Sequence, residues 1–329
     1  MKKLTIGIPT WNRATEIRDA LDSVVFQLQE DEKLKNEVEI FVSINASTDN
    51  TEDVIKKYQD KFKDIEIRYF VQPVNVGFDR NVDNLFKHAK GEFVWLLSDD
   101  DAIEDGAISK VIEIINQNKD NNLGVIFVNY SSYDNSLNKI IGESDPWFLN
   151  YQKSQIFFSY EELFTKTNDL GTQMISSNIV NRNAWNNLDL SNYYDSDIIH
   201  VFAFLLLHLK KFTTFVEYSK IVKYRTENNE GRWTKIKENP FNLNYSAFVV
   251  NNKIISKMNS NIYRFFYKTE FKQLFKGIAY YKSQNYLLDN LSISKSIVAV
   301  NGYRLRTFLL IIALYVPNFL YKLIYKLKK

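Results

Sequence analysis

The sequence predicts an α/β fold in which a mostly parallel, Rossmann-like sheet carries helices on both faces. Up to Tyr130, apolar runs typical of buried strands alternate with segments whose apolar residues recur at helical spacing. A composition of 45% hydrophobic and 25% charged residues over 329 positions is ample for a buried core and excludes a disordered chain. From about residue 240 the helical spacing continues with little strand pattern, which predicts a C-terminal helical extension.

The periodicity places each element in order. We expect strands at residues 4–10, 38–45, 65–71, 93–97, 123–130, 174–180 and 221–224. We expect helices at residues 17–28, 51–62, 78–89, 104–116 and 197–209. The change in pattern divides the chain into a first domain at 1–239 and a helical region at 240–329.

Composition excludes several kinds of site. The absence of cysteine excludes disulfides, thiolate zinc sites and thiol catalysis, and three histidines make a histidine-rich metal site unfavourable. No G-x-G-x-x-G occurs, which argues against a dehydrogenase. The net charge of +3 is uneven: after Asp289 there are seven basic residues and no acidic ones, so the rest carries −4. The α/β part has no basic patch for nucleic acid.

Residues 307–321 are uncharged, and Arg304, Arg306 and Lys322 flank them. Three readings stay open: an amphipathic anchor at an anionic membrane surface, a buried helix, and a true membrane span, for which the segment is short. The apolar run at the N-terminus is too short for a signal-peptide core. We therefore expect a cytoplasmic protein that lies peripherally on the inner face of the plasma membrane.

Polar and aromatic residues follow four of the predicted strands. In parallel sheets of this kind, ligands bind beyond the carboxyl ends of the strands. The four groups are Pro9-Thr10-Trp11-Asn12-Arg13, Asn45-Ala46-Ser47-Thr48-Asp49, Asn75-Val76-Gly77-Phe78 with Arg80-Asn81, and Ser98-Asp99-Asp100-Asp101. Trp11 can stack on a base or cover the sheet edge, and Arg13 and Arg80 can pair with phosphate or be surface charges. Ser47 and Asp49 can cap the next helix.

Three consecutive aspartates at the end of a buried strand need a physical reason. Two like charges about 4 Å apart repel by roughly 4 kcal/mol at an effective dielectric constant of about 20. A hard divalent cation, Mg²⁺ or Mn²⁺, would relieve that repulsion and still bind phosphate. Alternatively, Asp99, Asp100 and Asp101 form a solvated turn that caps the following helix.

In order and spacing, these four groups resemble the motifs of family 2 glycosyltransferases, which have the GT-A fold, over roughly residues 1–225. The residues of the second and fourth groups are most similar to those of bacterial members that add sugars to surface polysaccharides, such as abequosyltransferase-like enzymes. The resemblance implies that Pro9, Thr10 and Trp11 line the base pocket of a nucleotide-sugar site. It implies further donor contacts from Arg13, Asn45, Asn75, Arg80 and Asp100, and a Mg²⁺ or Mn²⁺ ion on Asp101 and Asp99.

The resemblance also implies a catalytic carboxylate at the start of a later helix. Asp197 is the expected base, with Asp195 second, although both also fit as acids favoured by the helix dipole. A later basic and aromatic loop with Arg225, Gly231, Arg232 and Trp233 is expected to be either a lid over the diphosphate or a plain surface loop.

The expected activity is transfer of a sugar, with inversion, from a UDP-, dTDP-, CDP- or GDP-sugar to a hydroxyl of a lipid-linked or growing surface polysaccharide. One alternative, a nucleotidyltransferase of sugar activation, is disfavoured because Pro9–Arg13 contains no glycine. Another is an inactive nucleotide-sugar-binding protein. Ile44 and Ser98, which stand where the family commonly has acids, keep that alternative open.

Overall fold

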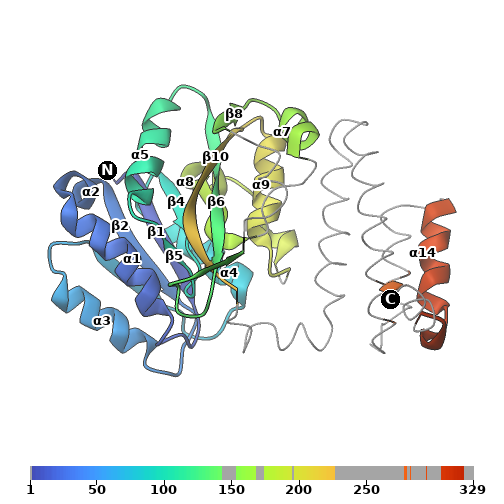
Figure 1. The fold of residues 1–329 in the computed structure, drawn as a ribbon, viewed down its shortest axis with the longest axis horizontal. Coiled ribbons are helices and arrows are strands. Elements are labelled where there is room, and N and C mark those ends of the chain that lie inside the picture. Colours follow the sequence, from blue (N-terminus) through green and yellow to red (C-terminus); the bar gives the residue numbers. More distant parts are fainter. Residues whose placement is uncertain are drawn as a thin grey trace. The chain divides into compact units, whose positions relative to one another are not determined.

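The computed structural model describes residues 2–142, 153–167, 174–194 and 196–226, together with 278, 279, 282, 294 and 305–321. The chain divides into two compact units, Met1–Asn228 and Asn229–Lys329 (Figure 1). The first unit contains the α/β sheet. The domain boundary expected at 239/240 stays a prediction, and the loop with Gly231, Arg232 and Trp233 lies outside the described residues.

The described part of the first unit forms one ten-stranded sheet with the path β3-β2-β1-β4-β9-β6-β10-β5, to which β7 and β8 add at β6 and β10. The strands are β1 Leu4–Thr10, β2 Val38–Ile44, β3 Ile67–Val71, β4 Phe93–Leu96, β5 Ala102–Ile103, β6 Leu123–Tyr133, β7 Ile140–Gly142, β8 Gln155–Phe157, β9 Asn178–Asn181 and β10 Thr213–Arg225. Strands β3, β2, β1 and β4 run parallel, as do β6 and β10, whereas β9 is antiparallel to β4 and β6.

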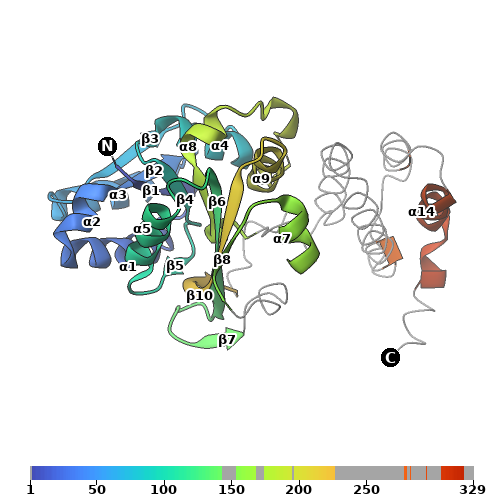
Figure 2. The same ribbon diagram turned by 90° about the horizontal axis from the view of Figure 1, so that it is seen from above.

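Helices cover both faces of this sheet, as predicted (Figures 1 and 2). They are α1 Ile17–Glu30, α2 Glu32–Glu37, α3 Thr51–Lys61, α4 Phe78–His88, α5 Ala107–Gln117, α7 Tyr160–Thr167, α8 Arg182–Asn186 and α9 Ile199–Leu209, with short 3₁₀ turns at Ile175–Ser177 and Ser191–Tyr193. Helices α1 and α5 lie side by side, joined by the bond from Ile108 N to Gln27 Oε1 at 3.2 Å. On the opposite face, α4 packs on β1 and β2 and contacts α8, which contacts α9.

The first four strands occupy the predicted places, and the second half of the sheet differs from the prediction. The strand expected at 174–180 is a 3₁₀ turn followed by the shorter β9, which inserts antiparallel between β4 and β6. The strand expected at 221–224 is the C-terminal part of β10, whose irregular pairing with β6 obscures a simple alternation of side chains. The helix expected from Glu104 starts at Ala107, because Ala102–Ile103 pairs with β10 as β5.

The core lies between the sheet and its two helical layers. Every residue of β1 and β2 is buried, as expected of parallel strands covered on both faces. Helix α4 approaches β1 so closely that a Cβ atom on Gly7 would lie 2.5 Å from Leu85 Cδ2. Glycine at position 7 therefore lets α4, which carries several of the predicted site residues, pack directly on the strand.

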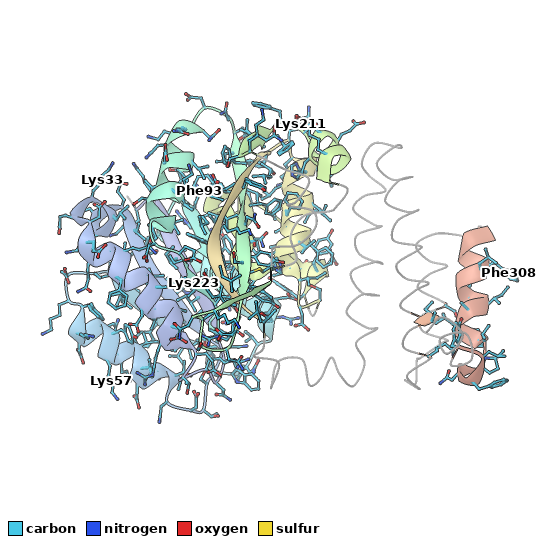
Figure 3. All side chains as sticks on the ribbon, viewed as in Figure 1. Lys33, Lys57, Phe93, Lys211, Lys223 and Phe308 are labelled. Carbon is cyan, nitrogen blue, oxygen red and sulfur yellow. The ribbon has the colours of Figure 1, made fainter. Side chains whose placement is uncertain are left out.

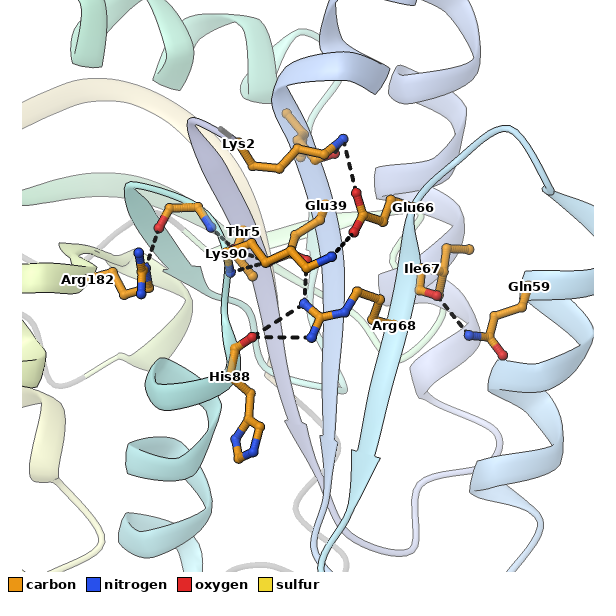
Figure 4. Close-up of polar contacts among 12 residues, drawn as sticks. Lys2, Thr5, Glu39, Gln59, Glu66, Ile67, Arg68, His88, Lys90 and Arg182 are labelled. Atoms are coloured by element: carbon orange, nitrogen blue, oxygen red, sulfur yellow. Dashed lines mark hydrogen bonds and ion pairs between the residues drawn. The ribbon is translucent and has the colours of Figure 1, made fainter.

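A polar network holds the amino ends of these strands, opposite the expected site (Figure 4). The fully buried Glu39 carboxylate accepts hydrogen bonds from Thr5 Oγ1 at 2.7 Å and from the Lys90 backbone N–H. Its other oxygen is 2.8 Å from Arg68 Nη1, and Lys90 pairs with Glu66. The contacts link β1, β2, β3 and the start of the segment that leads to β4.

The second unit contains α14, Leu305–Tyr315. Phe308, Leu309, Ile312 and Tyr315 are exposed on this helix, and Phe319 and Leu320 are exposed just after it; Figure 3 shows Phe308 projecting from α14. No helix in the described part of the chain is both long enough and apolar enough to cross a membrane. The helical spacing expected for 240–329 is thus seen in α14, and most of that region lies outside the described residues.

Candidate active site

The loops after β1 and β2 are bonded to each other at the carboxyl edge of the sheet. Asn12, whose φ of 53° is left-handed, donates its N–H to Ser47 Oγ at 2.9 Å and accepts from Thr48 N at 2.8 Å. Asp49 Oδ2 accepts from Ala14 N at 3.1 Å, and Asp49 Oδ1 accepts from Thr51 N at the start of α3. Asp49 therefore accepts from the first amide of α3, in keeping with the capping role expected for it, and also holds the first loop.

Trp11 and Arg13 stand on this bonded pair of loops. Pro9 and Thr10 are buried at the end of β1, whereas the Trp11 side chain is 53% exposed. Arg13 is half-buried and forms an ion pair with Glu16 at 3.1 Å. The Trp11 ring is thus open to a ligand, while its backbone is held in place from both sides.

Asn45 uses both ends of its side chain to hold the loop after β3. Its Nδ2 donates to Asn75 Oδ1 at 2.9 Å, and its Oδ1 accepts from Val76 N at 2.8 Å. Asn75 Oδ1 also accepts from Gly77 N at 3.0 Å, and Gly77 has a φ of 82° immediately before α4. In this structure Asn45 and Asn75 set the conformation of the turn that leads into α4.

Arg80 and Asn81 point to different surroundings from adjacent positions on α4. The Arg80 guanidinium lies 4.7 Å from the centre of the Tyr194 ring. Asn81 is buried and exchanges hydrogen bonds with Ser43, donating to its carbonyl at 3.0 Å and accepting from its hydroxyl at 2.8 Å. Asn81, expected beside the donor, therefore attaches α4 to β2.

The aspartate turn after β4 is tied to two distant segments. Asp101 is 2% exposed, its Oδ2 accepts from Ser176 Oγ at 2.5 Å, and its Oδ1 accepts from Arg225 N at 3.0 Å. The Ser176 hydroxyl oxygen also accepts from Ser98 N at 2.9 Å, and Arg225 Nε donates to the Asp100 carbonyl at 2.7 Å. Burial, followed by the charge of Asp100, raises the pKa of Asp101.

Arg13 faces the same turn. Burial lowers the pKa of its guanidinium, but the charges of Asp99, Asp100 and Glu16 outweigh this effect and raise it overall. The ends of β1 and β4 thus place a permanent cation within electrostatic influence of two carboxylates. Asp99 is buried, whereas Asp100 is half-buried and accepts from Ser98 Oγ at 2.5 Å.

The predicted metal ligands fit a cation unevenly. Both Asp101 oxygens accept hydrogen bonds inside the protein, so its geometry is that of a structural residue, and its role as a ligand stays a prediction. Within the described residues, no group of three or more His, Cys, Asp or Glu side chains is arranged to hold a metal ion. Mg²⁺ commonly binds one or two carboxylates together with substrate phosphate oxygens. Asp99 and Asp100 provide two carboxylates in this turn.

The expected base, Asp197, lies two residues before α9. It is exposed, and its φ of 60° is left-handed, which is unusual for a residue other than glycine. The buried Asp79 carboxylate accepts hydrogen bonds from the backbone N–H groups of Ser196 at 2.6 Å and Asp197 at 2.9 Å. Asp195, the second choice, lies outside the described residues.

Comparison with known proteins agrees with this arrangement. The model of the glycosyl transferase family 2 domain matches residues 5–184, more than half of the chain. The chain belongs to glycosyl transferase family 2. This match confirms the expected family, and the fold has the sheet and helical layers of a GT-A glycosyltransferase.

The relatives of this chain include two bacterial glycosyltransferases. Abequosyltransferase RfbV of Salmonella typhimurium is 26% identical over 208 residues, covering 61% of this chain and 60% of the relative. A GalNAc(5)-diNAcBac-PP-undecaprenol beta-1,3-glucosyltransferase of Campylobacter jejuni is 35% identical over 118 residues, 36% of each chain. The matches thus span about 60% and a little over one third of these two relatives.

Solved structures show the same fold at low sequence identity. S. aureus TarS has a TM-score of 0.67 and 16% identity, covering 91% of this chain and 81% of that chain, and its complex with UDP-GlcNAc has a TM-score of 0.65. A mannosyltransferase from Pyrobaculum calidifontis, in complex with GDP-Man and Mn²⁺, has a TM-score of 0.50 and 15% identity, covering 96% and 87%.

Three residues that organise this family 2 site were not identified from the sequence. Ser176 and Asp79 carry no local signal, because each acts on a segment far away along the chain. Arg225 was noted only as part of a later basic loop, and the structure places it against the aspartate turn.

Proposed function

We propose that this protein transfers a sugar, with inversion, from a nucleotide-sugar donor to a hydroxyl group of a lipid-linked or polymeric saccharide. The observation that carries the proposal is that one loop, after β1, carries the exposed Trp11 ring together with Arg13, whose guanidinium feels the charges of Asp99 and Asp100. An aromatic face, a guanidinium and carboxylates able to share a cation are the chemistry that binds a base and a diphosphate.

In this proposal Trp11 stacks on the base, and Pro9 and Thr10 form the floor below it. Arg13, with Arg80, pairs with the diphosphate, and Asn45 and Asn75 keep the loop before α4 in a shape that admits the donor. Ser98 bonds Asp100, which holds that carboxylate toward the turn. TarS was solved with UDP-GlcNAc and the mannosyltransferase with GDP-Man, so donors of this class fit the fold.

Asp197 is the proposed catalytic base. Its carboxylate takes the proton of the acceptor hydroxyl while that oxygen attacks the anomeric carbon, and the bond to the diphosphate breaks on the opposite face of the sugar. One proton moves to Asp197, and the leaving nucleoside diphosphate carries away the electron pair, so the anomeric configuration inverts. The exposure of Asp197 leaves it accessible to an acceptor.

Asp99 and Asp100, with donor phosphate oxygens, are the proposed holders of Mg²⁺ or Mn²⁺. When bound, such an ion neutralises the charge that develops on the leaving diphosphate. The buried Asp101 positions the turn through Ser176 and Arg225. Added Mn²⁺ should therefore strengthen donor binding less in Asp100→Asn than in Asp101→Asn.

A thermal-shift experiment tests the donor site. UDP, GDP, CDP and dTDP are added separately with Mg²⁺ or Mn²⁺, and a nucleotide that binds raises the melting temperature by mass action. Trp11→Ala should weaken binding of the preferred nucleotide by about 5- to 150-fold, since stacking on a base contributes roughly 1–3 kcal/mol. Phe26→Ala, which removes an equally exposed aromatic ring on α1, is the control and should leave binding unchanged. No shift with any nucleotide would contradict the proposal.

An assay of nucleoside diphosphate release then distinguishes a protein that transfers sugar from one that only binds nucleotide. Asp197→Asn should keep the nucleotide-dependent shift and lose sugar transfer. A wild-type protein that binds nucleotide but transfers no sugar to an undecaprenyl-diphosphate-linked saccharide would instead favour the inactive binding protein.

The proposed location is the cytoplasmic surface of an anionic membrane, where a lipid-linked acceptor is available. The exposed apolar residues of α14 and the seven basic residues after Asp289 support this placement. Phe308→Ser should reduce co-sedimentation with phosphatidylglycerol vesicles, and Phe158→Ser, at an equally exposed phenylalanine, should not. Equal sedimentation of the two variants would contradict a membrane role for α14.

A further inference from the structure

The feature that carries a further inference is the Asp79 carboxylate in the first turn of α4. Asp79 is 2% exposed, and four hydrogen bonds end on it from one distant segment. Its Oδ2 accepts from Ser196 N at 2.6 Å, Ser196 Oγ at 3.1 Å and Asp197 N at 2.9 Å, and its Oδ1 accepts from Ile199 N at 3.1 Å.

These donors include backbone groups at the start of α9. The first N–H groups of a helix have no partner within the helix, and a negative charge near them is favourable. The residue before α9, Ile198, makes no capping bond with its own side chain. Asp79 therefore acts as the cap of α9 from another helix, across 120 positions of sequence to Ile199.

The bonds to Asp79 also fix the backbone of Asp197, which has a left-handed conformation. A left-handed conformation is uncommon for residues other than glycine, although aspartate adopts it more readily than most, so the φ of 60° at Asp197 benefits from contacts that fix the neighbouring backbone. Asp79 Oδ2 binds the N–H groups of Ser196 and Asp197 themselves. The backbone of Asp197 is thus held rigidly while its side chain stays exposed.

The donor side of the site reaches the same turn of α4. Gly77, the residue before the helix, is bonded through Asn75 and Asn45 to the end of β2. Asp79 lies two positions further on. One helical turn therefore connects the loop that the proposed function assigns to the donor with the segment that carries the proposed base.

We propose that Asp79 is a positioning residue for sugar transfer, which holds Asp197 at a set place relative to the loop before α4. This rests on the proposed function, because it takes Asp197 as the base. Asp79 itself does not touch the reacting atoms. Its neutral isostere, Asp79→Asn, turns an amide toward N–H groups that need an acceptor, so the 196–199 segment loses bonds while the donor loop keeps its own.

The test combines one structural and one kinetic measurement. In the full chain, Asp79→Asn should speed hydrogen exchange of the amides of Ser196, Asp197 and Ile199 and leave the amides late in α9 unchanged. It should also lower kcat by about 100-fold, the order expected when a reacting group is misplaced by about 1 Å. KM for the sugar nucleotide should stay within about threefold, and the nucleotide-dependent thermal shift should persist.

Asp83→Asn is the matched control on the same helix. Asp83 is also buried and accepts from Trp185 Nε1 at 3.0 Å and Tyr194 Oη at 2.8 Å, so its hydrogen bonds in the described part of the chain go to segments other than 196–199. It should lose stability without the 100-fold fall in kcat. If Asp79→Asn does not fold, Asp79→Glu, which keeps the charge but displaces the oxygens, takes its place with the same expected split between kcat and KM.

Asp197→Asn, measured in parallel, separates failure of this inference from failure of the proposed function. If Asp197→Asn loses transfer and the Asp79 variant keeps wild-type kcat, Asp197 remains the base and the positioning role is overturned. If Asp197→Asn keeps wild-type transfer, the base is elsewhere, and both the assignment of Asp197 and the positioning role of Asp79 fall. Equal falls in kcat for the Asp79 and Asp83 variants would also overturn the positioning role of Asp79, since general loss of packing would then explain the effect.

Discussion

The backbone N–H of Arg225 lies 3.0 Å from Asp101 Oδ1, although 124 positions separate the two residues. The Arg225 guanidinium donates to the Asp100 carbonyl at 2.7 Å and to the Asn135 carbonyl, and pairs with Asp19 at 2.5 Å. The last residue of β10 therefore holds the aspartate turn after β4 and connects it to α1.

Arg225→Met should loosen this turn, because it removes the guanidinium bonds and keeps the backbone bond to Asp101. We expect the free energy of unfolding to fall by about 2–3 kcal/mol, typical of a lost buried bond from a charged group. We also expect a smaller nucleotide-dependent thermal shift. Lys223→Met, which removes a half-buried partner of Glu104 on the same strand, is the control and should leave the shift intact. A full shift in Arg225→Met would contradict the role given to this residue.

Two glycines with left-handed backbones offer a matched comparison. Gly77 precedes α4 with φ 82° and Gly106 precedes α5 with φ 75°, and a Cβ atom would meet no atom within 4 Å at either position. Alanine should therefore cost about 1 kcal/mol of stability at Gly106, whose ψ of 0° is in the αL region, and about 1–3 kcal/mol at Gly77, whose ψ of 166° lies in a region open essentially only to glycine. Only Gly77→Ala should also weaken nucleotide binding, measured by titration calorimetry. Equal affinities in the two variants would remove the loop before α4 from the donor site.

Glu39 should matter for stability and not for binding. It is fully buried between Thr5, Lys90 and Arg68 (Figure 4), so Glu39→Gln leaves N–H and guanidinium groups without their charged acceptor. We expect a loss of about 2 kcal/mol in urea unfolding, less than for a fully buried pair because the Arg68 side chain is 32% exposed. Asp64→Asn, which breaks the exposed pair with Lys35, should leave the unfolding midpoint unchanged.

His208 should make the protein less stable in acid. Burial lowers the pKa of His208 to about 3, and its Nε2 lies 2.9 Å from Thr214 Oγ1. The unfolded chain, with a histidine pKa near 6.5, binds a proton that the folded form excludes, so stability is full above about pH 6.5 and falls as the pH drops toward 3. The slope from this group is about 1.4 kcal/mol per pH unit.

Urea unfolding at pH 7.5 and pH 5.0 measures this slope. His208→Gln should reduce the difference in unfolding free energy between the two pH values, whereas His88→Gln, at an exposed histidine, should not. An unchanged difference in His208→Gln would show that other groups cause the acid sensitivity.

The sequence by itself determined the alternation of the first four strands with their helices, the end of each strand and the four groups of residues placed there. These features depend on local periodicity and on turn residues such as Gly77, so neighbouring positions suffice to predict them. They were also enough to identify the family, because the order and spacing of the motifs along the chain are local information.

Only the tertiary structure decided which of those residues are free to act. Asp101 is closed off by Ser176 and Arg225, Asn81 is bonded to Ser43, and Asp197 is held by Asp79. The contact of Asp101 with Ser176 depends on β9 lying beside β4, because Ser176 lies in the 3₁₀ turn that immediately precedes β9. The physical reason is that a hydrogen bond requires its two atoms within about 3 Å, and the packing of distant segments sets that distance.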